Sequence, residues 1–136
     1  MKIVNRLTFF LFLTLSIISA CSKGGGSTPP PQEANLSVTT DPANGSTQLP
    51  ALGPYNLKVT ITSTMPVNGV KIDITAKKDD GSNTVFFTTS VNKTTAVNDF
   101  TITGTPAATQ CLAEVKVTSL TKATNVWNGS YRYSSK

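Results

Sequence analysis

From residue 35 to the C-terminus, apolar and polar residues alternate in short runs, as in strands with one buried face. The most regular run is 55–62, and runs 70–76 and 111–117 follow the same period of two. Less regular runs complete the series: 36–40, 84–91, 100–102 and 126–133. No window has apolar residues at the spacing of an amphipathic helix over a usable length. The pattern therefore predicts seven short strands and no helix.

Turn-forming residues separate these runs. Asp41-Pro42 closes the first, and Asp79-Asp80-Gly81-Ser82 is the strongest turn signal in the chain. The pair Phe86-Phe87 interrupts the alternation of its run. Thr and Val, which favour strands, are abundant, whereas Glu114 is the one Glu beyond residue 34. We expect an all-β fold, a two-sheet antiparallel β-sandwich of about seven strands.

Over residues 35–136 this pattern resembles the immunoglobulin (Ig) or fibronectin type III architecture. The antibody subtype joins its second and sixth strands by a disulfide. Cys111 could be the sixth-strand member, but the second strand offers Val59 or Ile61, and Thr109 stands where that subtype has Tyr. The resemblance therefore implies a generic Ig-like module. Because Cys111 lies in an alternating run, we expect its thiol to be buried and inert.

The charged residues of the third and sixth strands predict how these strands align. Lys71 and Asp73 would share an outer face with Glu114 and Lys116 if the strands pair antiparallel. Placing Asp73 opposite Glu114 would also place Lys71 opposite Lys116, and like charges directly opposite are destabilising. We therefore predict a register that pairs either Asp73 with Lys116 or Lys71 with Glu114.

The start of the chain has the layout of an export signal. Lys2 and Arg6 precede an almost unbroken apolar run at 7–19. As a helix, residues 7–20 would span only ~21 Å at ~1.5 Å per residue. The hydrocarbon core of a bilayer is ~30 Å thick, which disfavours a transmembrane span.

The apolar run ends in Ile18-Ser19-Ala20-Cys21, which resembles the lipobox of bacterial lipoproteins. Ordinary signal peptides prefer a small residue where Ile18 stands, whereas the lipobox accepts a branched one. The resemblance implies removal of residues 1–20 as a signal peptide. It also implies diacylglycerol on the Cys21 sulfur and a further acyl chain, such as palmitate, on its amine. Two or more chains would anchor the protein stably to a membrane.

Residues 21–34 follow as a lipidated Cys and a Gly-, Ser- and Pro-rich tether, before the Ig-like domain at 35–136. Ser22 directly after the Cys is similar to lipoproteins directed to the outer membrane. Surface-exposed lipoproteins of Bacteroidota carry an acidic patch at this place, and this chain does not. We therefore expect the protein at the periplasmic face of the outer membrane.

Composition argues against several classes of function. The sequence contains no His, which removes the commonest general base and metal ligand. Without the signal, ten basic and seven acidic residues leave a net charge of +3, too mild and scattered for nucleic acid. The turn at 79–82 lacks the ligand spacing of a calcium loop. We predict no enzyme, no cofactor, no metal site and no nucleic-acid partner.

Two sets of residues carry alternative interpretations. Trp127, Tyr131 and Tyr133 share one face of the last strand, where they could bind sugars if exposed or pack in the core if buried. Gly129 between them could form a bulge. Asp73 and Glu114 could serve a hydrolase if both lay in one concave pocket, but solvated carboxylates beside lysines explain them as well.

The combined prediction is a lipid-anchored, non-catalytic Ig-like module that binds a protein or glycan partner, or has a structural role, at the outer membrane. The alternative is a carbohydrate-binding accessory lipoprotein that uses the aromatic residues of the last strand. In both cases the membrane is contacted through acyl chains on Cys21.

Overall fold

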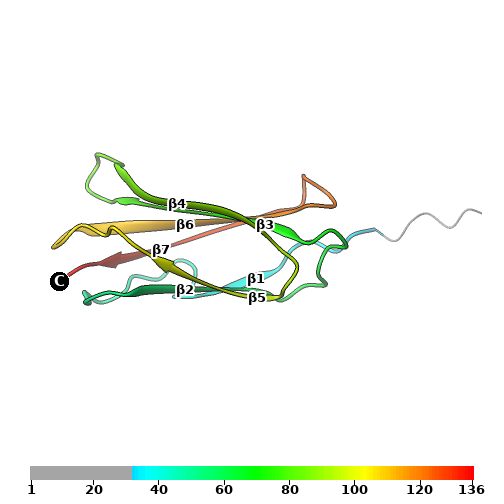
Figure 1. The fold of residues 1–136 in the computed structure, drawn as a ribbon, viewed down its shortest axis with the longest axis horizontal. Helices are drawn as coiled ribbons and strands as arrows, with labels where there is room; N and C mark the ends of the chain where they lie inside the picture. Colours follow the sequence, from blue (N-terminus) through cyan, green and yellow to red (C-terminus); the bar gives the residue numbers. More distant parts are fainter. Residues whose placement is uncertain (1–31) are drawn as a thin grey trace, which may run out of the picture. The chain divides into compact units, whose positions relative to one another are not determined.

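The computed structural model describes residues 32–136, which belong to the unit Pro31–Lys136. This part of the chain folds into seven strands and no helix (Figure 1). The strands, in chain order, are β1 (Val38–Asp41), β2 (Tyr55–Ile61), β3 (Val70–Lys78), β4 (Val85–Lys93), β5 (Val97–Ile102), β6 (Gln110–Ser119) and β7 (Val126–Ser134). They form a three-stranded sheet, β1-β2-β5, and a four-stranded sheet, β4-β3-β6-β7, antiparallel throughout. The predicted two-sheet β-sandwich is confirmed.

The core lies between the two sheets and is built by the alternation read from the sequence. Each central strand turns every second side chain inward, because successive side chains of a strand point to opposite faces. The buried apolar side chains of the central strands are Leu57, Val59, Ile61, Val70, Ile72, Ile74, Ala76, Cys111, Ala113, Val115 and Val117. The burial of these side chains is the main apolar contribution to the stability of the fold.

The register between β3 and β6 is one of the two predicted. Asp73 lies opposite Lys116, and Glu114 lies opposite Thr75, so no like charges face each other across this pair. Asp73 also forms an ion pair of 3.1 Å with Lys71. This alignment therefore keeps the apolar side chains of both strands in the core and avoids like charges facing each other on the outer face.

A register shift explains why Phe86 and Phe87 break the alternation of β4. Phe87 lies opposite Ala76, but the next residue of β3, Lys77, lies opposite Val85. Phe86 is thus the extra residue of a bulge, which changes the direction of a strand locally. Both rings are half-buried against the core.

The free side of β7 is covered by a segment of the long β1–β2 connection. Thr47 and Ala51 form parallel bridges to Arg132 and Ser135. The backbone amide of Gln48 donates to the carbonyl of Arg132 at 2.8 Å, and the Arg132 amide donates to Ser46 at 2.9 Å. We call residues 45–51 the strap. Its pairing protects a sheet edge that would otherwise present unpaired backbone groups.

The sandwich has two ends, which are distinguished by the chain connections that they carry (Figure 1). At one end the described chain begins, beside the connections 62–69, 94–96 and 120–125. We call this the N-terminal end. The opposite end carries the connections 42–54, 79–84 and 103–109 and the C-terminus.

Candidate binding surface

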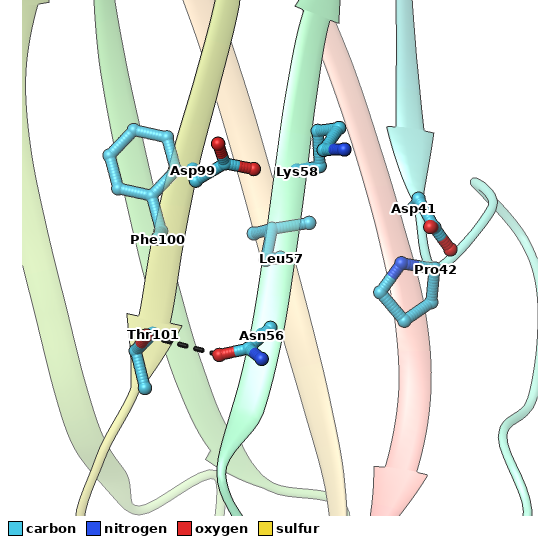
Figure 2. A pocket seen from close by; sticks show the side chains of 8 residues that line it. All are labelled: Asp41, Pro42, Asn56, Leu57, Lys58, Asp99, Phe100 and Thr101. Carbon is cyan, nitrogen blue, oxygen red and sulfur yellow. Dashed lines mark hydrogen bonds between the residues drawn. The ribbon is translucent and has the colours of Figure 1, made fainter.

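A shallow concavity of about 570 Å³ lies on the outer face of sheet β1-β2-β5 (Figure 2). All three strands of the sheet contribute to it. Its lining residues are Asp41, Pro42, Asn56, Leu57, Lys58, Asp99, Phe100 and Thr101. The polar side chains of β2 and β5 in this set are exposed, whereas Leu57 points into the core. The concavity therefore combines exposed polar side chains with apolar surface on one sheet.

Strand register places the charged residues of this surface in one row. Lys58 of β2 lies opposite Asp41 of β1 on one side and opposite Asp99 of β5 on the other. Opposite charges in directly facing positions stabilise a sheet by about 0.2–1 kcal/mol per pair. Because strands are ~4.8 Å apart, the backbone positions of the two acidic residues are separated by roughly 10 Å, with the lysine position between them.

A second, uncharged row lies beside the first. Asn56 faces Thr101, and the hydroxyl of Thr101 donates a hydrogen bond of 3.1 Å to the Asn56 side-chain oxygen, drawn as a dashed line in Figure 2. The Asn56 amide group and the charged row supply further donors and acceptors. The surface can thus hydrogen-bond and ion-pair with a polar partner that presents several groups at sheet spacing.

Sequence reasoning did not identify this surface. The alternation of 55–62 indicates that Asn56 and Lys58 point outward, and that signal was present. Their neighbours Asp99 and Thr101 come from β5, more than forty residues further along the chain. The adjacency of β2 and β5 depends on how the sheet assembles and has no local signature in the sequence.

Tyr131 and Tyr133 lie in the core, each only 3% exposed. The Tyr133 ring packs against Tyr55 with centroids 4.9 Å apart and against Tyr131 at 5.7 Å. Burial raises the pKa of Tyr131, and burial is also the main cause that raises the pKa of Tyr133 to about 12. Of the two placements left open by the sequence, the structure has the core placement for both tyrosines.

Trp127 also points toward the core side of its sheet, opposite Val117, and is half-buried. Its indole covers Gly129, where an added Cβ would overlap the ring. The pairing of β7 with β6 continues through Gly129 without a shift, so the bulge that the sequence left open at Gly129 does not form. The last strand therefore does not present the exposed row of rings that sugar stacking requires.

Asp73 and Glu114 are both held by lysines on the outer face of sheet β4-β3-β6-β7. Glu114 forms an ion pair of 3.0 Å with Lys77. Burial pushes the pKa of Asp73 up, but hydrogen bonds from Ser90 and Lys71 and the charges of Lys71 and Lys116 outweigh it and lower the pKa. A general acid at neutral pH needs a raised pKa. The hollow that Glu114 lines does not include Asp73. The hollow at Glu114 therefore does not bring these two carboxylates together.

The other residues considered from the sequence, Cys111 and the turn at 79–82, have structural roles within the fold. Cys111 is a buried free thiol, as predicted, and its pKa is raised mainly by burial, with a further contribution from the charge of Asp79. In the 79–82 turn, the Asp80 carboxylate accepts hydrogen bonds from the amide and hydroxyl of Ser82. Within residues 32–136, no group of three potential metal-ligating residues comes together. Cys21 and the predicted signal peptide lie outside the described residues.

Among residues 32–136, no helix has the length and apolar character needed to cross a membrane. Comparison of the chain with protein-family models, curated proteins and solved structures finds no match.

Proposed function

We propose that this protein is a lipid-anchored, non-catalytic Ig-like module that binds a polar partner at the periplasmic face of the outer membrane. The anchor is supported by Lys2, Arg6, the apolar run 7–19 and the lipobox-like stretch before Cys21. The Ig-like assignment is supported by strand order. Strand β4 extends the sheet of β3, β6 and β7, which is the place of strand C′ in variable-type Ig domains.

The observation that carries the binding role is the uncovered concavity with its row of charged residues on sheet β1-β2-β5. The outer face of a β-sandwich is ordinarily polar, and this face is distinguished by a concavity over three strands in which Lys58 lies between Asp41 and Asp99. Preorganised polar groups on a rigid scaffold suit recognition of a charged or hydroxyl-rich partner. A protein surface and a glycan both satisfy this chemistry.

Mass spectrometry of the mature protein tests the anchor. We expect an N-terminal Cys21 that carries a diacylglycerol group and an additional acyl chain, in protein recovered from the outer-membrane fraction. A Cys21→Ser variant should lose the lipid and leave that fraction. An unmodified mature N-terminus in the unaltered protein would contradict the anchor.

Affinity capture with the membrane-anchored protein tests the binding surface. We expect an Asp41→Ala, Asp99→Ala double variant to recover its specific partner at least about tenfold less well, because two charge contacts are lost. Glu114→Ala is the matched control, since it removes a carboxylate from the outer face of the other sheet. Equal recovery by the unaltered protein and the double variant would exclude this surface as the binding site.

A further inference from the structure

Exposed apolar side chains occur at the N-terminal end of the sandwich, and two of them, Val67 and Leu120, lie in connections that are hydrogen-bonded to each other, whereas Val97 and Val126 point outward from opposite sheets. Among residues 32–136, seven large apolar side chains are exposed, and four belong to this end: Val67, Val97, Leu120 and Val126. Val67, at the tip of the β2–β3 connection, is 93% exposed. Single exposed apolar residues are ordinary on protein surfaces, but grouped ones indicate an interaction site.

Two of these side chains are held together by their loops. The backbone amide of Leu120 donates to the carbonyl of Gly69 at 3.0 Å, and the amide of Asn68 donates to the Thr121 hydroxyl at 3.0 Å. Gly69 in turn donates to Pro66 at 2.8 Å, which closes the turn that carries Val67. The connections 62–69 and 120–125 therefore present Val67 and Leu120 as one ordered unit.

The first residues of the domain are hydrogen-bonded to residues at the two ends of the 120–125 connection. Glu33 accepts hydrogen bonds from the Ser119 hydroxyl at 3.0 Å and from the Asn125 amide at 2.5 Å. The Asn125 amide also donates to the carbonyl of Ala34, and its side-chain oxygen accepts from the amide of Leu36. These contacts hold the beginning of the domain beside the connection that carries Leu120.

The charges of this end favour an anionic surface. Lys122 lies in the 120–125 connection, and Lys93 ends β4 opposite Val70, the first residue of β3. Glu33 is the acidic residue among the loops of this end, so the two lysines against its one carboxylate leave this end with a small positive charge. Apolar side chains next to lysines are the combination that binds the interface of anionic membranes.

The short segment between Cys21 and Glu33 limits how far this end can lie from the bilayer. Glu33 lies twelve positions after Cys21, which is at most ~40 Å of extended chain. We infer that the N-terminal end of the sandwich rests on the bilayer, with Val67 and Leu120 in the lipid interface and Lys93 and Lys122 at anionic headgroups. This inference rests on the proposed lipid anchor. It implies that the opposite end points away from the membrane.

Fluorescence quenching from lipid tests the inference in vesicles of phosphatidylcholine and phosphatidylglycerol. Mature lipidated protein carries a fluorophore on Val67→Cys, or on Leu52→Cys at the opposite end, where Leu52 is 76% exposed. Buried Cys111 does not compete for the label in the folded protein. A headgroup-linked quencher should quench the label at 67 at least about twofold more than the label at 52. Equal quenching at both positions overturns the inference.

Two further measurements separate this result from other causes. Lys122→Glu should reduce quenching at 67 in anionic vesicles, because attraction to the anionic headgroups is replaced by repulsion, and it should leave quenching unchanged in pure phosphatidylcholine. An unchanged signal in anionic vesicles would contradict the role of the lysine. Flotation and the mass of the N-terminus are measured on the same sample. If the protein is lipidated and floats with the vesicles but both labels are quenched equally, the inference is wrong and the anchor stands. If the protein is unmodified and does not float, both the anchor and the inference are wrong.

Discussion

Gly129 is required by the side chain of Trp127 and not by its own backbone. The indole of Trp127 lies over Gly129 on the core side of β7, so the space of a Cβ is already occupied. A strand interior normally disfavours glycine, because it has no side chain to pack. Here the neighbouring ring supplies that packing.

We predict that Gly129→Ala lowers the free energy of unfolding by about 1–3 kcal/mol, because the new methyl group overpacks against the indole. Denaturant titration measures the change. The same substitution in a Trp127→Leu background should cost much less, since the clash is gone. An equal loss in both backgrounds would show that the ring is not the cause.

The lowered pKa of Asp73 implies that the stability of the protein depends on pH. Because its pKa is lowered in the folded protein, it contributes stability above its unfolded pKa, near 3.9, and that stability is lost as pH falls through the folded value. We expect Asp73→Asn to be less stable than the unaltered protein at neutral pH. The difference should shrink below about pH 4.

Thermal unfolding from about pH 7 to about pH 2 measures this difference. The effect is modest, because the carboxylate is partly solvated. Ser90→Ala removes one of the hydrogen bonds that lower the pKa, so it should reduce the pH-dependent part. If the stability difference between the unaltered protein and Asp73→Asn stays constant down to the lowest pH, the pKa of Asp73 is not the cause of the pH dependence.

The strap at 45–51 shows how one strand edge is closed by the chain itself. It runs parallel to β7 and exchanges backbone hydrogen bonds with Arg132 on both sides of Thr47. The strap follows β1, so a single stretch of chain contacts first one sheet and then the other. It therefore links the two layers along one side of the sandwich.

We predict that Gln48→Pro lowers the free energy of unfolding by about 1–3 kcal/mol, because proline removes the amide that donates to Arg132. Gln48→Ala is the control: it keeps this amide and loses only the side-chain bond to Ser46. Chemical denaturation of both variants gives the comparison. Similar stability of the two would mean that the strap pairing contributes little.

The first described residues are joined to the sandwich by a small polar cluster. Glu33, Ser119 and Asn125 join residues that are 86 and 92 positions apart, and Ser119 and Asn125 are buried. Burying polar groups is favourable only when they are hydrogen-bonded. The cluster therefore defines where and in which direction the chain enters the sandwich.

We predict that Glu33→Ala releases this connection and costs about 1–3 kcal/mol, because Ser119 and Asn125 lose a charged acceptor. Hydrogen exchange of the amides at 33–37 should accelerate, while that of β3 and β6 stays slow. Gln32→Ala, at an exposed neighbour, is the control. Unchanged exchange at 33–37 in Glu33→Ala would contradict the role of the cluster.

Strand positions and the two-sheet class could be predicted because alternation and turn residues are local signals, and the alignment of β3 with β6 could be predicted once these strands were taken as partners. Side chains alternate along every strand, and charges at 71, 73, 114 and 116 exclude one register. The burial of Cys111 follows from the same alternation. The irregular phase at Phe86-Phe87 was visible in the sequence, but the bulge that explains it depends on the partner strand.

The candidate binding surface could not be predicted from the alternation alone, because it requires β1, β2 and β5 to be neighbours. Which strands become neighbours depends on the sum of many weak contacts between distant segments. The same holds for the strap on β7 and for the contact between Glu33 and Asn125. Period-two patterning could group Trp127, Tyr131 and Tyr133 on one face, but the packing of the two sheets determined that this face is the interior.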